Sequence, residues 1–135
     1  MSKVLITGGT GLIGRRLSSL LKAKGYEAII LTRNYNSKSS QDSFHWNIEE
    51  YSLDDSAFKN IDHILHLAGA GVADKRWSKK RKEEILTSRV VSTNLLYDTI
   101  KRLKIPLKSF IAASAIGYYG SSTTDKIFIE TDQPC

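Results

Sequence analysis

Glycines at regular spacing follow the first apolar segment of the chain, in the run TGGTGLIG at residues 7–14. Gly9, Gly11 and Gly14 fit the pattern G-x-G-x-x-G, and Gly8, Gly11 and Gly14 fit G-x-x-G-x-x-G. Glycine allows a tight turn and lets the backbone approach a pyrophosphate, while the N-terminus of a following helix offers unpaired N–H groups. The run lies between a strand-like segment and a helical pattern, which is the context such a site requires. It predicts a phosphate-binding turn; a glycine-rich turn that binds nothing is the alternative.

The end of the second predicted strand bears on which dinucleotide would bind there. Thr32 and Arg33 end that strand, where an NAD site usually places Asp or Glu to hold the ribose 2′-hydroxyl. The next carboxylate along the chain is Asp42. A guanidinium pairs with a 2′-phosphate that a carboxylate would repel. These residues predict NADP(H) in preference to NAD(H), and an ordinary solvated arginine is the alternative.

Strand-like and helical patterns alternate along the chain and would position these groups. Short apolar runs predict strands at residues 3–7, 28–32, 44–46, 61–68 and 109–114. Apolar residues at helical spacing predict one helix that ends at Gly25 and a long one over residues 78–103, which Pro106 follows. The polar segment 34–43 predicts a loop. Strands separated by helices need crossover connections, so the fold class is α/β with a doubly wound parallel sheet.

The long helix carries one regular apolar stripe. Five residues recur at helical spacing along it and predict the face that packs on the sheet: Leu86, Val90, Thr93, Tyr97 and Ile100. Tyr97 lies in the middle of this stripe, so we interpret it as a core residue.

Composition limits the class of protein. The 135 residues, 41% hydrophobic and 25% charged, predict one globular domain over residues 1–135. No segment approaches the ~20 apolar residues of a membrane span, and we expect no secretory signal. The single Cys135 fits the cytoplasm or another reducing compartment. His63 and His66 would point to opposite faces of one strand and His45 lies elsewhere, so no metal site is predicted.

The net charge of +6 is concentrated in one run, KRWSKKRK at residues 75–82, which Glu83 and Glu84 follow. A run of this kind is usually the solvated start of a helix. A polybasic patch for nucleic acid and attraction of a phosphorylated ligand are the alternatives. We expect no nucleic-acid partner.

Five motifs together resemble a known family. They are GGTGLIGRRL, LTR, HLAGAG, RWSKKRKEEILTSRVVSTNLL and ASAIGYYG, in this order. The chain resembles the extended short-chain dehydrogenases/reductases, particularly their atypical epimerase-family branch of nucleoside-diphosphate-sugar epimerase-like proteins, from residue 3 to near Gly120. The resemblance implies an NADP-binding Rossmann fold with strand order 3-2-1-4-5. It implies that the glycine turn contacts the pyrophosphate through Gly8, Gly11, Leu12, Ile13 and Gly14. Arg33 would lie beside the adenosine phosphate. The middle of the cofactor would be lined by Leu67, Ala68 and Gly69.

The resemblance also implies where a substrate would react. Ser114 ends the fifth predicted strand, where related enzymes keep a Ser or Thr that hydrogen-bonds the reacting carbonyl or hydroxyl. A helix or turn cap is the alternative role. Tyr118 and Tyr119 would form the floor of the substrate crevice or pack at its edge. Trp46 would pack near the adenine or in the core.

Two departures from the family pattern concern catalysis. Related enzymes place a Tyr, with a Lys four residues later, after the fifth strand, and that Lys favours the phenolate. Here Tyr118 and Tyr119 have no Lys at that spacing, and the pair Tyr97 and Lys101 lies before the strand. In addition, Arg89 stands where other branches of the family carry Asn.

These observations predict the NADP(H)-binding portion of an oxidoreductase or epimerase-like enzyme. A longer form would transfer hydride to or from a carbonyl or carbinol carbon of an unknown small molecule. A non-catalytic NADPH-binding or redox-sensing module is the alternative. Family members continue well past SAIGYYG, so we expect the substrate-binding C-terminal region to be absent and the sheet incomplete at the C-terminus. The resemblance implies the long helix as the surface of a possible homodimer, and the oligomeric state is left open.

Overall fold

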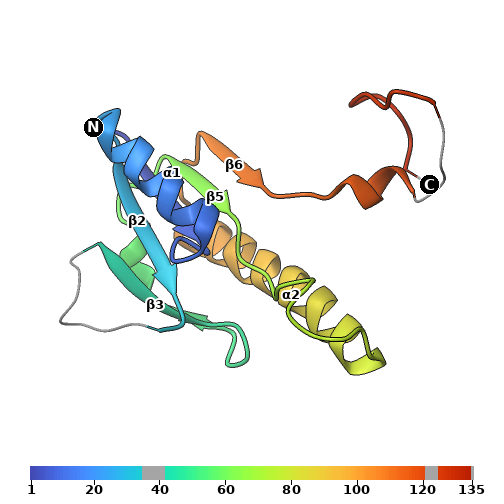
Figure 1. Cartoon of the computed structure of the whole chain (residues 1–135). Helices are drawn as coiled ribbons and strands as arrows, with labels where there is room; N and C mark the ends of the chain where they lie inside the picture. Colours follow the sequence, from blue (N-terminus) through green and yellow to red (C-terminus); the bar gives the residue numbers. More distant parts are fainter. Residues whose placement is uncertain (35–41, 121–124, 135) are drawn as a thin grey trace.

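One sheet forms the centre of the molecule. The computed structural model describes residues 1–34, 42–120 and 125–134. Within them the strand order is β4-β3-β2-β1-β5-β6 (Figure 1). The strands are β1 (Lys3–Thr7), β2 (Glu27–Thr32), β3 (Ser43–Asn47), β4 (Ser52–Leu53), β5 (His63–His66) and β6 (Ser109–Ala112). All neighbouring pairs are parallel except β3 and β4. This is the expected order 3-2-1-4-5 with a short antiparallel strand added at one edge, and the predicted doubly wound α/β fold is confirmed.

Two helices cover opposite faces of this sheet (Figure 1). They are α1 (Leu12–Ala23) and α2 (Lys79–Leu103). Val4 and Ile6 of β1 pack in the cluster that Leu21 of α1 covers, whereas Leu5 packs in the cluster that contains Leu95 and Leu96 of α2. Side chains alternate between the two faces of a strand, so β1 alone supplies both cores. Two short 3-10 helices, η1 (Asp55–Phe58) and η2 (Ile116–Tyr119), complete the described elements.

The ends of both helices lie close to where the sequence predicts them. Gly25 follows α1 with φ +82°, a left-handed conformation that glycine adopts readily. Ser78 is the N-cap of α2, and its hydroxyl accepts a hydrogen bond of 3.1 Å from the backbone N–H of Arg81. Lys104 ends α2 in a left-handed conformation. Among the described residues, neither helix combines the length and the apolar character that crossing a membrane requires.

The face through which α2 packs differs from the predicted one. Ser92, Leu95, Leu96 and Thr99 are buried against the sheet, whereas Tyr97 is 56% exposed. Leu86 and Val90 are exposed as well. The interpretation of Tyr97 as a core residue is therefore wrong. Of the predicted stripe, Ile100 alone packs against the core. The buried stripe includes two hydroxyl side chains, which apolar periodicity does not select.

Two segments that the sequence predicts as strands have different bounds, and a predicted loop lies mostly outside the described residues. β5 ends at His66 and β6 at Ala112, so residues 67–68 and 113–114 lie beyond the strands. After β6 the chain leads away from the sheet (Figure 1). Of the predicted loop at residues 34–43, positions 35–41 lie outside the described residues.

Candidate functional site

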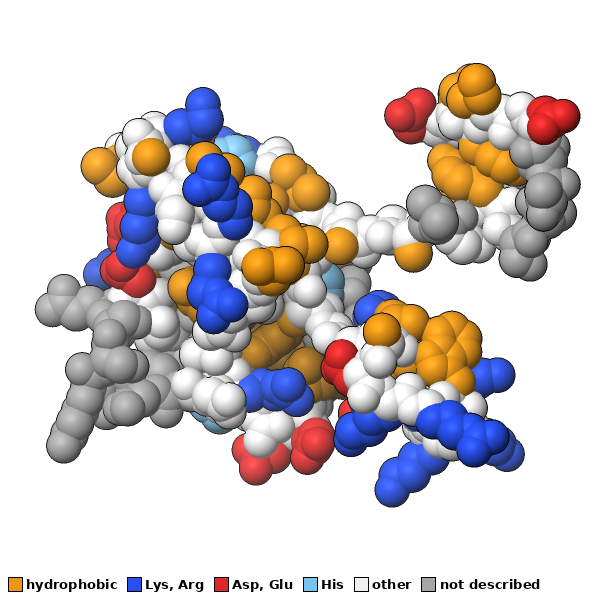
Figure 2. Space-filling model, in the orientation of Figure 1, with side chains coloured by type: hydrophobic (Ala, Val, Ile, Leu, Met, Phe, Trp, Pro, Cys, Tyr) orange, Lys and Arg blue, Asp and Glu red, His pale blue; other side chains and the backbone are white. Residues whose placement is uncertain are grey.

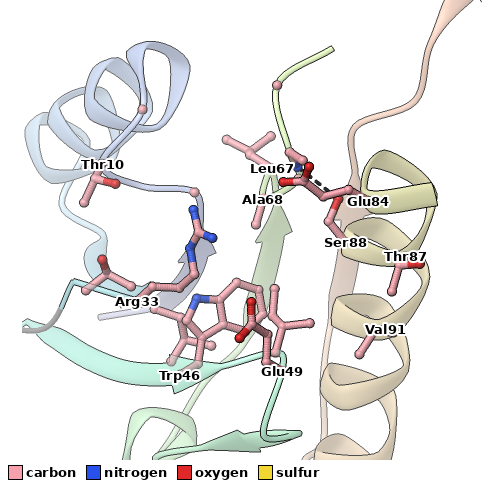
Figure 3. A pocket seen from close by; sticks show the side chains of 18 of the residues that line it. Thr10, Arg33, Trp46, Glu49, Leu67, Ala68, Glu84, Thr87, Ser88 and Val91 are labelled. Atoms are coloured by element: carbon pink, nitrogen blue, oxygen red, sulfur yellow. Dashed lines mark hydrogen bonds between the residues drawn. The ribbon is translucent and has the colours of Figure 1, made fainter. Parts of the chain in front are cut away.

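A cavity of about 800 Å³ lies at the carboxyl ends of β1, β2 and β5 (Figure 3). The connection from β1 to β2 passes over one face of the sheet and that from β5 to β6 over the other. This topological switch point is where open α/β sheets bind ligands. Five segments line the cavity, namely the glycine turn, the end of β2, the segment from Trp46 to Tyr51, the residues after β5 and the α2 wall. Their members include Gly8, Thr10, Gly11, Leu31, Thr32, Arg33, Trp46, Ile48, Glu49, Tyr51, Leu67, Ala68, Gly69, Ala70, Glu84, Thr87, Ser88 and Val91. The cavity therefore contains both groups that the sequence assigns to a dinucleotide.

The glycine turn is packed so closely that side chains would not fit. Gly8 has φ +71°, and a β-carbon there would lie 3.0 Å from the backbone nitrogen of Ala68. A β-carbon on Gly14 would overlap the Gly8 carbonyl oxygen and Gly9. Gly8 and Gly11 line the cavity, whereas Gly14 is buried beneath the turn. The glycines are therefore needed for close packing of helix, turn and strand.

Leu12 and Ile13 lie in the first turn of α1, and their side chains are exposed outside the cavity lining. Gly11 is the N-cap and offers no side-chain acceptor, and no acidic residue occupies the first turn. The N-terminal N–H groups of α1 are therefore left without an acceptor from a cap side chain.

Arg33 lies in the cavity lining next to Thr32. Its guanidinium group lies above the Trp46 ring in the close-up view (Figure 3). Arg33 forms no ion pair with the other described residues. The Thr32 hydroxyl accepts a hydrogen bond of 3.2 Å from the backbone N–H of Asn34, which fixes the turn after β2. An exposed guanidinium is thus held at the wall of the cavity, free of a carboxylate partner among these residues.

The loop after β5 is fastened to α2 by several hydrogen bonds. The backbone N–H of Ala70 donates to the Ser88 hydroxyl at 3.0 Å, and Arg89 donates to the Ala70 carbonyl at 3.2 Å. Arg81 donates to the Gly71 carbonyl. This loop and the first turns of α2 therefore form one wall of the cavity.

The basic run departs in one position from its predicted solvated state. Figure 2 shows Lys and Arg side chains gathered over the N-terminal end of α2. Arg81, in contrast, is only 6% exposed and pairs with Glu84 at 2.7 Å. The Arg81 guanidinium, with smaller contributions from Lys75 and Lys80, holds the pKa of the Glu84 carboxyl below its usual value. That the protein has no nucleic-acid partner stays a prediction.

The predicted substrate residues lie apart from this cavity. Ser114, Tyr118 and Tyr119, with Ala115, line a separate open cavity of about 310 Å³. The two tyrosine rings meet edge to face with centroids 5.1 Å apart. Because the chain leaves the sheet after β6, the structure does not bring these residues together with the glycine turn. Their assignments stay predictions.

A model of the NAD dependent epimerase/dehydratase family matches residues 4–135. The chain belongs to this family. The predicted resemblance to extended short-chain dehydrogenases/reductases and epimerase-family proteins is thereby confirmed.

Relatives of this family member include curated proteins and solved structures. An epimerase family protein of Mycobacterium leprae is 32% identical over 130 residues, which cover 96% of this chain and 41% of the relative. A human epimerase family protein solved with NADPH is 29% identical with a TM-score of 0.71, over 89% of this chain and 39% of that one. The UDP-glucose 4-epimerase of Bifidobacterium longum, solved with NAD⁺ and UDP, is 25% identical with a TM-score of 0.77, over 98% and 42%. The chain therefore spans about two fifths of the length of these proteins.

Several lining residues of this epimerase-family chain were missed by sequence reasoning. Thr10 lies within the glycine motif but is not one of its glycines, and Glu49 follows β3 in a segment without a recognisable motif. Ser88 belongs to the motif on the long helix, but that motif alone does not indicate contact with the loop after β5. Trp46 is buried and lines the cavity, as its core alternative expects, and packing near an adenine stays a prediction. Among residues 1–34, 42–120 and 125–134, no three His, Cys, Asp or Glu side chains gather as a metal site would require.

Proposed function

We propose that this chain binds a nicotinamide dinucleotide, with NADP(H) preferred over NAD(H), in the cavity at the carboxyl ends of β1, β2 and β5. The observation that carries the proposal is the presence of the glycine turn and Arg33 in one cavity. The human and Bifidobacterium relatives, solved with NADPH and with NAD⁺ respectively, support a dinucleotide but not the choice between the two.

The residues present fit the phosphates of such a cofactor. A β-carbon on Gly8 would meet the backbone of residues 67–68, and one on Gly14 would overlap the turn at Gly8 and Gly9. The backbone of Gly8, Gly11, Leu12 and Ile13 would hold the pyrophosphate, because the first turn of α1 has neither a cap side chain nor an acidic residue to occupy its N–H groups. Gly14, beneath the turn, would let α1 pack closely enough against Gly8 and Gly9 for this contact.

The remaining predicted residues would hold the adenosine end and the middle of the dinucleotide. Arg33, with Thr32 behind it, would pair with a 2′-phosphate, because a guanidinium offers two parallel donors to phosphate oxygens. The segment 67–69 would contact the middle of the cofactor from the opposite wall. Residues 1–135 would then be the cofactor-binding domain of an oxidoreductase or epimerase-like enzyme.

Catalysis would belong to the longer form of the protein. The nicotinamide, when bound, supplies or accepts a hydride. Ser114 would donate a hydrogen bond to the substrate oxygen, and Tyr118 and Tyr119 would contact the substrate. The proposal also includes a homodimer that forms through the exposed face of α2.

Parallel calorimetric titrations with NADPH and NADH test the proposal. The wild-type chain is expected to bind NADPH more tightly, and Arg33→Asp to lower the NADPH-to-NADH affinity ratio at least about tenfold, because a charge-assisted hydrogen-bonded pair is lost. Arg76→Asp is the matched control, since it makes the same charge change at an exposed residue outside the lining. An unchanged ratio in Arg33→Asp would remove Arg33 from its role, and a folded wild-type chain that binds neither dinucleotide would refute the function.

A non-catalytic NADPH-binding or redox-sensing module is the second candidate. The separation of the Ser114 cavity from the dinucleotide cavity favours it. So does the position of Tyr97 and Lys101 on the exposed face of α2. Consumption of NADPH with a panel of carbonyl compounds and nucleotide sugars, measured on a chain that extends beyond residue 135, separates the two candidates. Turnover supports the enzyme, and saturable binding without turnover supports the module.

A further inference from the structure

A buried hydrogen-bond network of polar side chains lies beneath the cavity and joins three elements. Thr7 at the end of β1 and Ser92 of α2 are fully buried, and His66 at the end of β5 is 5% exposed. The Thr7 hydroxyl lies 2.7 Å from Nδ1 of His66, and the Ser92 hydroxyl lies 3.1 Å from its Nε2. The Ser92 hydroxyl also donates to the Arg89 carbonyl at 3.1 Å. Each ring nitrogen of His66 therefore has one hydroxyl partner.

The partners determine which atom donates and which accepts in each hydrogen bond of this network. The Thr7 hydroxyl oxygen accepts from the backbone N–H groups of Leu67 and Ala68, each at 3.2 Å. Amides only donate, so His66 Nδ1 is the acceptor available to the Thr7 hydroxyl proton, and Nδ1 must carry no proton. The proton of a neutral ring then lies on Nε2 and is donated to Ser92, whose own proton goes to the Arg89 carbonyl. The bonds run in one consistent direction from the 67–68 backbone to α2.

The environment of the ring agrees with a neutral imidazole. Trp46 meets His66 edge to face, and Phe110 lies at a tilt with its centroid 6.1 Å away. Burial lowers the pKa of His66 below its usual value because the charged form loses its hydration. A proton on Nδ1 would in addition leave the buried Thr7 hydroxyl without its acceptor.

The same hydrogen-bond network bears on the distance between two walls of the cavity, the glycine turn and the residues after β5. The 67–68 peptide contacts both the Thr7 hydroxyl and Gly8, where a β-carbon would be 3.0 Å from Ala68 N and from Leu67 C. Leu67, Ala68 and Gly8 all line the cavity. A shift of this peptide would therefore change the space between the glycine turn and the opposite wall.

We propose that His66 is a positioning residue. In its Nε2–H form it orients the Thr7 hydroxyl toward the 67–68 backbone, anchors that wall to Ser92 of α2, and thereby sets the cavity width that a dinucleotide needs. This role rests on the proposed dinucleotide binding. His66 itself touches no substrate or cofactor.

Two nearly isosteric substitutions test the role. His66→Asn keeps an acceptor oxygen in the place of Nδ1, whereas His66→Leu has the same shape without an acceptor. We expect NADPH affinity to fall about tenfold in His66→Leu, which loses the bonds to both Thr7 and Ser92, and to fall less in His66→Asn, which loses only the bond to Ser92. His63→Leu is the matched control, since His63 makes a similar bond to the Ser109 hydroxyl at 2.8 Å on the same strand, outside the cavity lining. Wild-type affinity in a folded His66→Leu, or equal weakening in both His66 variants, would overturn the proposal.

A second measurement needs no cofactor and guards against a variant that fails to fold. Two-bond ¹⁵N–¹H spectra of the wild-type chain should show His66 protonated at Nε2 and not at Nδ1 at neutral pH; a proton on Nδ1 would overturn the proposal. If the folded wild-type chain binds neither NADPH nor NADH, the proposed function fails. Amide exchange then decides the positioning role. Leu67 and Ala68 should exchange faster in His66→Leu than in His66→Asn, and equal exchange would refute it.

Discussion

The tightest contacts in the candidate site are between backbone atoms. At Gly8 and Gly14 the space for a β-carbon is taken by the backbone of residues 67–68 and of Gly8 and Gly9. These contacts bring β1, α1 and the loop after β5 together at one point. The glycines therefore contribute to stability and to the proposed phosphate site through the same packing.

Gly14→Ala should damage both properties. The new methyl group would overlap backbone atoms that cannot rotate away, so we expect a loss of about 3 kcal/mol in the free energy of unfolding, at the upper end of usual overpacking. NADPH affinity should fall as well. Urea denaturation and calorimetric titration measure the two effects. Gly117→Ala is the control, because no atom lies within 4 Å of a β-carbon there; equal stability of the two variants would contradict the packing argument.

At the scale of the elements, α2 combines two different faces. Its buried face carries Leu95 and Leu96 together with the hydroxyl residues Ser92 and Thr99, while the apolar Leu86 and Val90 are exposed. The buried hydroxyl of Ser92 is tolerated because His66 and the Arg89 carbonyl satisfy it. The face that packs is thus determined by partners on the sheet as well as by apolar periodicity.

Alanine substitutions distinguish the two faces of α2. Leu96→Ala should lower the free energy of unfolding by about 2–5 kcal/mol, because it removes a fully buried side chain and leaves a cavity. Leu86→Ala should cost less than about 1 kcal/mol, because Leu86 is 64% exposed. Urea denaturation of both variants provides the comparison. A larger loss in Leu86→Ala would mean that this face is covered in solution, as the expected homodimer requires.

The sequence predicts the sheet well and the helix packing poorly. Buried parallel strands are continuous apolar runs bounded by glycine, so β1 and β2, with the turn between β1 and α1, are visible in the sequence. The burial of Arg81 depends on Gly71 and Glu84, and that of Ser92 depends on His66, so neither follows from local pattern. β4 has two residues, too few for a periodic signal. The separation of Ser114 from the cavity follows from the path of the chain after β6, which no local motif encodes.

At the scale of the whole molecule, ion pairs lie at the amino ends of the strands, opposite the cavity. Asp62 accepts a hydrogen bond of 3.0 Å from the backbone N–H of Lys3 and forms an ion pair of 2.6 Å with Lys108. It thereby links the starts of β1, β5 and β6. The Lys108 side chain, followed by the backbone N–H of Lys3, lowers the pKa of Asp62 to about 2.

Acid should therefore weaken the fold through Asp62. The folded pKa lies below the ordinary value of 3.8, so the stabilisation is present above pH 3.8 and is lost as the pH falls toward 2. Asp62→Asn should be less stable than wild type at pH 6, and the difference should shrink between pH 3.8 and 2. Urea denaturation across this range measures it, with Glu130→Gln at an exposed residue as the control. A difference that does not change with pH would contradict the assignment.

The chain has two tryptophans in contrasting places, which gives the molecule a built-in optical reporter. Trp46 is buried at the cavity, whereas Trp77 is exposed on the loop before α2, where its indole N–H donates to the Val72 carbonyl. Trp77→Phe would leave Trp46 as the sole source of indole emission. Reduced nicotinamide accepts excitation energy from a nearby indole, so NADPH added to this variant should quench Trp46 fluorescence and sensitise its own. In Trp46→Phe the remaining Trp77, which lies outside the cavity lining, should respond less, and the difference between the two variants reports how close the bound nucleotide lies to Trp46.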